Sequence, residues 1–130
     1  MDVVSSIVTV LGANESYLSY YTQLWNDCAV YLSRWNSGED LVSCISFAST
    51  LLEVYGEQSI FVVNSILDIL PISSKYDYEY CRANSYYIIS RLITTFPLQC
   101  EAYLQQFTQI LQEGLQLMNG DVRIREGYHK

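Results

Sequence analysis

Apolar residues recur every three or four positions in six segments of the chain, and this spacing predicts amphipathic helices. Glycine, proline and asparagine lie between the segments, where they favour turns over regular helix. The predicted helices cover residues 2–11, 15–35, 39–55, 58–70, 78–96 and 97–118. After a break at Asn119 and Gly120, residues 121–130 are polar and are predicted to form at most one short turn.

Three residues near the segment boundaries sharpen this prediction. Asn14 and Asp77 are expected to cap the helices that follow them, because a short polar side chain can accept a hydrogen bond from a free N–H group of the first turn. Pro71 is expected to end the fourth helix, since proline removes a backbone donor. β-Branched residues in 58–70 and 78–96 would also suit strands, but the segments are long and lack two-residue hairpin turns. The predicted fold class is therefore all-α.

Length and charge narrow the class of protein. A chain of 130 residues fits a single domain, 1–130, and half of its residues are hydrophobic, so it can form a core. Seven basic and fourteen acidic residues give a net charge of −7, which argues against binding to nucleic acids or anionic lipids. No apolar run reaches the ~20 residues of a membrane span, and the first residues lack the basic stretch of a signal peptide. We expect a soluble, cytoplasmic protein with no direct membrane insertion.

Residue types that commonly carry catalysis are sparse. The only histidine, His129, is next to the C-terminus, and there is no Gly-rich phosphate loop or Ser–His–Asp set. Glu39 and Asp40 are adjacent at a helix start, where acidic side chains stabilise the helix. The four cysteines form no CxxC pair and fall inside predicted helices, so we expect buried free thiols and no metal site. These features favour a binding protein without a cofactor over an enzyme.

An internal repeat is one interpretation of the helices. When the chain is shifted along itself by 41 residues, so that residue 47 meets residue 88, residues 47–70 align with residues 88–111. We call this shift the repeat offset. Matched positions include Ser49 with Ser90, Leu51 with Leu92, Tyr55 with Phe96, Gln58 with Gln99, Val63 with Leu104, Ile69 with Ile110 and Leu70 with Leu111. The first two helices fit a degenerate first copy, and a period of about 40 residues with paired helices is typical of HEAT-like solenoids. This interpretation predicts three helix pairs that act as a scaffold or adaptor.

Residues 80–87, with the sequence YCRANSYY, suggest a second interpretation. They resemble the first homology motif of the Bcl family of apoptosis regulators. Tyr80 takes the place of the motif's tryptophan, Arg82 matches its arginine, and Tyr86 and Tyr87 match its aromatic pair.

Other segments follow the order of the family's motifs. Residues 52–57, LEVYGE, resemble the third motif, and residues 38–40, GED, are a competing placement for it. Residues 119–121, NGD, followed by Tyr128, resemble the Asn/Gly turn and short aromatic-bearing helix of the second motif. Without the C-terminal membrane anchor of many relatives, the chain is similar to the compact members that large DNA viruses encode.

The resemblance implies a compact bundle of six to eight helices around a central helix, residues 78–96. It implies a pro-survival regulator that sequesters the amphipathic death-motif helix of pro-apoptotic proteins in a hydrophobic groove, with Arg82 pairing with the partner's aspartate. A viral member would act in the host cell cytoplasm, and exposed aromatic surface would permit a homodimer. The implied groove residues are Leu52, Tyr55, Ile66, Ile69, Glu79, Tyr80, Arg82, Ser85, Tyr86 and Ile89. We favour this interpretation, and the HEAT-like one stays open.

Overall fold

The structure is a computed structural model that describes the backbone of residues 2–32 and 38–128, and the side chains of residues 4–28 and 40–116. All regular secondary structure in these ranges is helical, so the predicted all-α class is confirmed. In chain order the elements are α1 (Asp2–Leu11), α2 (Glu15–Leu32), α3 (Gly38–Tyr55), the 3-10 helix η1 (Gly56–Val62), α4 (Val63–Ser73), α5 (Glu79–Thr95), α6 (Pro97–Cys100), the 3-10 helix η2 (Glu101–Tyr103) and α7 (Leu104–Tyr128). Within the described ranges, no helix is both long and apolar enough to cross a membrane.

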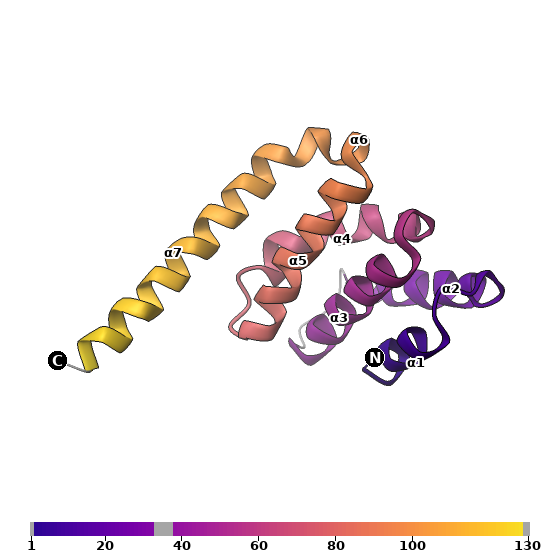
Figure 1. Cartoon of the computed structure of the whole chain (residues 1–130), viewed down its shortest axis with the longest axis horizontal. Helices are drawn as coiled ribbons and strands as arrows, with labels where there is room; N and C mark the ends of the chain where they lie inside the picture. The colour runs from indigo at the N-terminus through magenta and orange to yellow at the C-terminus, as the bar shows by residue number, and fades with distance from the viewer. Residues whose placement is uncertain (1, 33–37, 129–130) are drawn as a thin grey trace.

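The helices form a layered bundle (Figure 1). α3 packs against α1 on one side and against α5 on the other, so these three helices make one layer. α2 and α4 lie behind this layer in the view of Figure 1, and α4 packs against both α3 and α5. After α6 the chain reverses, and α7 runs back along α5. As a result, α1 and α7 lie at opposite ends of the bundle.

Helix boundaries recur at the repeat offset, the same shift that aligns the sequence with itself. α2 begins one repeat offset before η1 and ends one repeat offset before the end of α4. α3, η1 and α4 begin one repeat offset before α5, α6 and α7, respectively. Burial recurs as well, because Trp25, Ile66 and Phe107 follow one another at this offset and all three lie in the core. The recurrence therefore extends from sequence to secondary structure and packing.

Aromatic side chains join α2 to α3. The ring of Tyr21 packs edge-on against Phe47 with 6.5 Å between ring centroids, and it lies 5.9 Å from the ring of Tyr55. The Trp25 ring lies 6.1 Å from Phe47. Each such pair contributes about 0.5–1.5 kcal/mol beyond its buried area. This cluster fixes α2 against α3.

Pro71 does not end the fourth helix, contrary to the prediction. α4 continues through Pro71 to Ser73, and the region predicted to start at residue 58 begins as the 3-10 helix η1. The N–H of Ser74 donates to Leu70 O (3.0 Å), and the Cys81 thiol donates to Ser73 O (3.6 Å). Proline near a helix end removes few internal hydrogen bonds, and contacts with α5 hold this last turn in helical form.

The two predicted caps have different outcomes. Asn14 does cap its helix, since Asn14 Oδ1 accepts a hydrogen bond from the N–H of Ser16 (2.9 Å). The cap at Asp77 is wrong, because α5 begins after Tyr78, whose backbone is extended, and no side chain caps this end. The Asp77 carboxylate instead lies 4.0 Å from Arg82 Nη1. The predicted end of the second helix, residues 33–35, lies outside the described residues.

The predicted helix over residues 97–118 is both divided and extended. The short helices α6 and η2 precede α7, and α7 continues through Asn119 and Gly120 to Tyr128. The turn predicted at residues 119–121 for the second Bcl-like motif is therefore wrong, because these residues are helical. A glycine inside a helix costs only about 1 kcal/mol relative to alanine, and a helix of 25 residues tolerates that cost.

α5 is not enclosed on all sides, contrary to the predicted central helix. It contacts α3, α4, α6 and α7. Its buried residues are Cys81, Ser85, Ile88, Ile89 and Leu92. Ala83, Tyr87 and Ser90 on its other side are exposed, because no described helix covers that side. α5 is one amphipathic helix within a layer.

Candidate binding surface

Most of the apolar residues that the Bcl resemblance assigns to a groove lie in the core. Leu52, Ile66, Ile69 and Ile89 are buried between helices. They hold the layers together by contact with other apolar side chains. Their side chains are therefore closed to solvent and to a partner helix.

Two polar residues of the predicted groove are also used inside the fold. Ser85 is fully buried, and its Oγ lies 2.7 Å from Ser73 Oγ and 2.8 Å from Cys81 O. The Tyr55 hydroxyl donates to Asn14 O (3.0 Å) and so ties α3 to the turn before α2. Burial raises the pKa of Tyr55 above its ordinary value. Both residues have structural partners and no free polar group directed at solvent.

Arg82 clamps the loop that joins α4 to α5. Its Nη1 donates to Tyr76 O (2.9 Å) and lies 4.0 Å from Asp77 Oδ1. Its side chain is 21% exposed, so most of it is shielded from solvent. Glu79, also predicted for the groove, lies exposed in the first turn of α5. The contacts of Arg82 are those of a residue that stabilises a loop.

Tyr86 lies between α5 and α7. Its hydroxyl donates to Ser74 O (3.5 Å). A Cβ placed on Gly114 of α7 would lie 2.5 Å from the Tyr86 hydroxyl oxygen, so the absence of a side chain at Gly114 lets the two helices approach. Tyr86 is therefore part of the contact between two helices.

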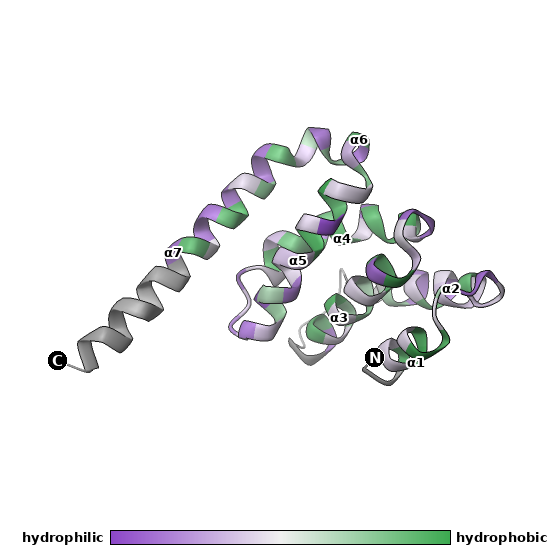
Figure 2. Cartoon of the chain, viewed as in Figure 1, coloured by the Kyte–Doolittle hydropathy of each residue, from purple (hydrophilic) through white to green (hydrophobic). Residues whose placement is uncertain are grey.

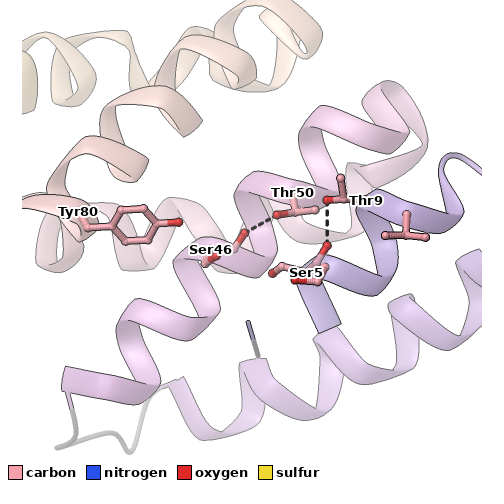
Figure 3. Close-up of a pocket in the computed structure, with 7 residues that line it drawn as sticks. Ser5, Thr9, Ser46, Thr50 and Tyr80 are labelled. Carbon is pink, nitrogen blue, oxygen red and sulfur yellow. Dashed lines mark hydrogen bonds between the residues drawn. The ribbon is translucent and has the colours of Figure 1, made fainter. Parts of the chain in front are cut away.

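Tyr80 is the predicted site residue that borders an open pocket (Figure 3). The pocket has a volume of about 430 Å³ and lies among α1, α3 and the start of α5. We call it the hydroxyl pocket, and its lining residues are Ser5, Ser6, Thr9, Val10, Ser46, Thr50 and Tyr80. Residues that are two positions apart in a helix are rotated by about 200° around its axis, so Tyr80 and Arg82 face opposite sides of α5. The structure thus separates the predicted site residues among the core, the α4–α5 loop, the α5–α7 contact and this pocket.

The hydroxyl pocket repeats one arrangement on two helices. Thr9 Oγ1 donates to Ser5 O and Thr50 Oγ1 donates to Ser46 O, both at 2.9 Å. The two pairs are separated by the repeat offset, so they occupy equivalent positions in successive repeats. No charged residue lines the pocket. The Ser5 hydroxyl oxygen is buried and has no hydrogen-bond partner within the described part of the chain.

A strip of α5 continues this surface into the third repeat. Tyr80, Asn84, Tyr87 and Arg91 are spaced by four, three and four residues, which places them on one face of the helix. We call these four residues the α5 strip. Tyr87 and Arg91 lie one repeat offset after Ser46 and Thr50. Asn84 Nδ2 and Arg91 Nε are buried below this face and have no hydrogen-bond partner among the described residues.

Motif analysis of the sequence missed this surface, because serine and threonine inside helices match no functional motif. The available signal was the identity of Ser5 with Ser46 and of Thr9 with Thr50 at the repeat offset. Ser5, Thr9 and Ser46 lie outside the aligned segments 47–70 and 88–111, and Ser5 and Thr9 belong to the copy that is least similar to the others.

The described residues include no cluster of three or more His, Cys, Asp or Glu side chains that could bind a metal ion. The cysteines Cys28, Cys44, Cys81 and Cys100 are free thiols. Burial raises the pKa of each of them, most strongly for Cys44, which also lies beside the Cys28 thiol. A raised pKa keeps a thiol protonated at neutral pH, and a protonated thiol is a weak nucleophile.

The chain was compared with protein families, with curated proteins and with solved structures, and no match was found in any of the three comparisons.

Proposed function

We propose that this protein is a HEAT-like helical-repeat module, a scaffold or adaptor that binds an extended segment of a partner protein across α1, α3 and α5. The observation that carries the proposal is the hydroxyl pocket, in which equivalent Ser and Thr residues of two successive repeats line one open surface. In stacked helical repeats, equivalent positions of one layer form an extended binding surface. The recurrence of helix boundaries at the repeat offset supports the same proposal.

The chemistry of the surface favours an extended peptide. A peptide in this conformation presents backbone carbonyl groups at regular intervals, and each carbonyl can accept a hydrogen bond. The exposed hydroxyl groups of Tyr80 and Tyr87 can donate to such carbonyl groups. Tyr80 and Tyr87 are partly exposed and add large rings with a polar tip, a residue type enriched at protein interfaces.

Sequestration of a death-motif helix is the function that the Bcl resemblance implies, and residues 80–87 are what supports it. A groove of that kind needs Arg82 free to pair with a partner carboxylate. In the structure Arg82 donates to Tyr76 O, and the expected wall residues Leu52 and Ile66 are fully buried. These contacts favour the repeat module, and the death-motif helix becomes a second arm of the same test.

The proposal is tested by selecting peptides from a random display library against the full chain, with death-motif helices of pro-apoptotic proteins included as defined probes. Thr9 is exposed at the pocket, so Thr9→Trp fills the pocket from the surface, and Tyr80→Ala removes its aromatic wall. Ser19→Trp and Tyr20→Ala are matched controls, since both residues are exposed on α2.

We expect selected peptides to lose at least tenfold in affinity with Thr9→Trp and Tyr80→Ala, about 1.4 kcal/mol, and to keep it with both controls. Thermal melts verify that each variant folds. If the pocket variants bind as tightly as the parent, the surface is assigned wrongly. If only the death-motif helices bind, and Arg82→Ala abolishes that binding, the Bcl-like function replaces this one.

A further inference from the structure

The outer side of α7 carries an apolar stripe that no described helix covers. Leu104, Thr108, Leu111 and Leu115 are spaced by four, three and four residues, the spacing of a seam between two packed helices. The three leucines are 47%, 39% and 60% exposed. Figure 2 shows hydrophobic positions recurring along the coloured part of α7, at the edge of the bundle.

The equivalent stripe one repeat earlier is covered. The positions one repeat offset before Leu104, Leu111 and Leu115 belong to α4 and the turn after it. These are Val63, Leu70 and Ser74, and Leu67 corresponds to Thr108. All four are buried, and α4 packs against both α3 and α5. α7 therefore exposes the face that the next helix covers inside the chain.

The opposite end of the bundle has the complementary feature. Ile7, Val10 and Leu11 on α1 are 46%, 83% and 46% exposed. The equivalent positions one repeat later are Ala48, Leu51 and Leu52 of α3, and all three are fully buried. α1 thus exposes positions that an inner helix of the same layer buries.

Residues 104–116 of α7 and residues 2–11 of α1 are nearly free of charge, although the chain as a whole carries a net charge of −7. Glu113 is the one charged residue in residues 104–116, and its Oε2 lies 3.1 Å from Lys75 Nζ. The other polar residues of that stretch are threonine and glutamine, and α1 carries Asp2 as its one charged residue. Two acidic chains repel each other over most of their surfaces, and these end faces avoid that repulsion.

We infer that copies of this chain associate head to tail, with the α1 face of one copy packed on the α7 stripe of the next. In this contact α1 of the second copy would pack on α7 of the first copy. Within one chain, α5 packs on α4 in the equivalent way. Such a contact joins two different surfaces, so it leaves one free face at each end and permits assemblies longer than a dimer. The inference depends on the repeat offset and the two end faces, of which the α1 face shares Val10 with the hydroxyl pocket.

Sedimentation velocity of the full chain over a range of concentrations tests this association, with two variants that each block one end. Ile7→Glu places a carboxylate in the α1 face outside the hydroxyl pocket, and Leu111→Glu does so in the α7 stripe. Leu98→Glu is the control, because Leu98 is 81% exposed on α6 and belongs to neither face. Circular dichroism melts verify folding.

The parent and Leu98→Glu should form species that grow with concentration, and Ile7→Glu and Leu111→Glu should each be monomeric alone. An equal mixture of the two blocked variants should form a one-to-one dimer, since one variant keeps a free α7 stripe and the other a free α1 face. A parent that stays monomeric at millimolar concentration overturns the inference. Dimerisation of Ile7→Glu alone also overturns it, because it indicates a symmetric contact through α7.

Discussion

α4 and α7 occupy equivalent places in two successive repeats, yet their surroundings differ. Leu70 of α4 is fully buried, and its equivalent Leu111 of α7 is 39% exposed. Both helices present an apolar stripe at the same spacing, so the stripes alone do not distinguish them. The difference comes from position in the stack, because α5 follows α4 and no described helix follows α7. An apolar stripe marks a surface that can be covered, and the neighbouring helices decide whether it is.

The largest expected effect separates these two leucines. Leu70→Ala should lower the free energy of unfolding by about 2–5 kcal/mol, because it leaves a cavity in a packed core. Leu111→Ala should lower it by at most about 1 kcal/mol at concentrations where the chain is monomeric, since its side chain is already partly in water. Urea unfolding of both variants measures the difference. Equal losses would show that α7 is covered as fully as α4.

Gly114 sharpens the comparison, since its equivalent one repeat earlier is Ser73, another small residue close to α5. Gly114→Val should lower the free energy of unfolding by about 1–3 kcal/mol, because the new side chain would meet the Tyr86 ring. Gln112→Val, at an exposed position of the same helix, is the control and should change stability little. If both variants unfold at the same urea concentration, α7 does not approach α5 closely at Gly114.

Arg82 is a position at which the repeats differ, since the equivalent residue of α3 is the apolar Leu41. Arg82→Ala removes the hydrogen bond to Tyr76 O and should lower the free energy of unfolding by about 0.5–1.5 kcal/mol. Peptides selected on the hydroxyl pocket should bind this variant within threefold of the parent by calorimetric titration. A loss of 20-fold or more, about 1.8 kcal/mol, is the result expected of a Bcl-like groove instead.

The smallest effect concerns Tyr55 and its equivalent Phe96, which differ by one hydroxyl group. Burial raises the pKa of Tyr55, so the folded state keeps this proton at pH values where the unfolded chain loses it. That contribution to stability is complete below about pH 10, the ordinary value for tyrosine, and falls as the pH rises towards the folded-state pKa.

Tyr55→Phe should therefore lose less stability than the parent as the pH rises above about 10, the ordinary tyrosine pKa. At neutral pH it should be less stable by about 1 kcal/mol, because the hydrogen bond to Asn14 O is lost. Urea unfolding across this pH range gives both quantities. The same alkaline slope in both proteins would mean that Tyr55 titrates as freely when folded as when unfolded.

The spacing of apolar residues and the turn-forming residues between segments predicted most of the helices. Apolar spacing gave the bounds of α1 and the end of α3, and Asn14 was recognised as a cap. Pro71 and Asn119 were misjudged because their effect depends on what surrounds them. Contacts with α5 carry the last turn of α4 past the proline, and the length of α7 absorbs the Asn–Gly pair.

The candidate site was much less predictable. The resemblance in residues 80–87 drew attention to Arg82, whose hydrogen bond is to the carbonyl of Tyr76 in a loop. Tyr80 was named for a groove and borders a pocket, but on the opposite side of the helix from Arg82. Ser5 and Thr9 gave no motif, because their role depends on α3 lying beside α1 and presenting Ser46 and Thr50. Such a surface exists only after the layers have packed.

Small-angle X-ray scattering of the Leu111→Glu variant tests most directly whether the chain is a stack of helix pairs. This variant is expected to be monomeric, so the measurement reports the shape of one chain. A compact domain of 130 residues has a radius of gyration of about 14 Å. With α1 and α7 at opposite ends, we predict a clearly larger radius and a distance distribution with a long tail. A radius of about 14 Å with a symmetric distribution would contradict the stack and favour a compact bundle around a central helix.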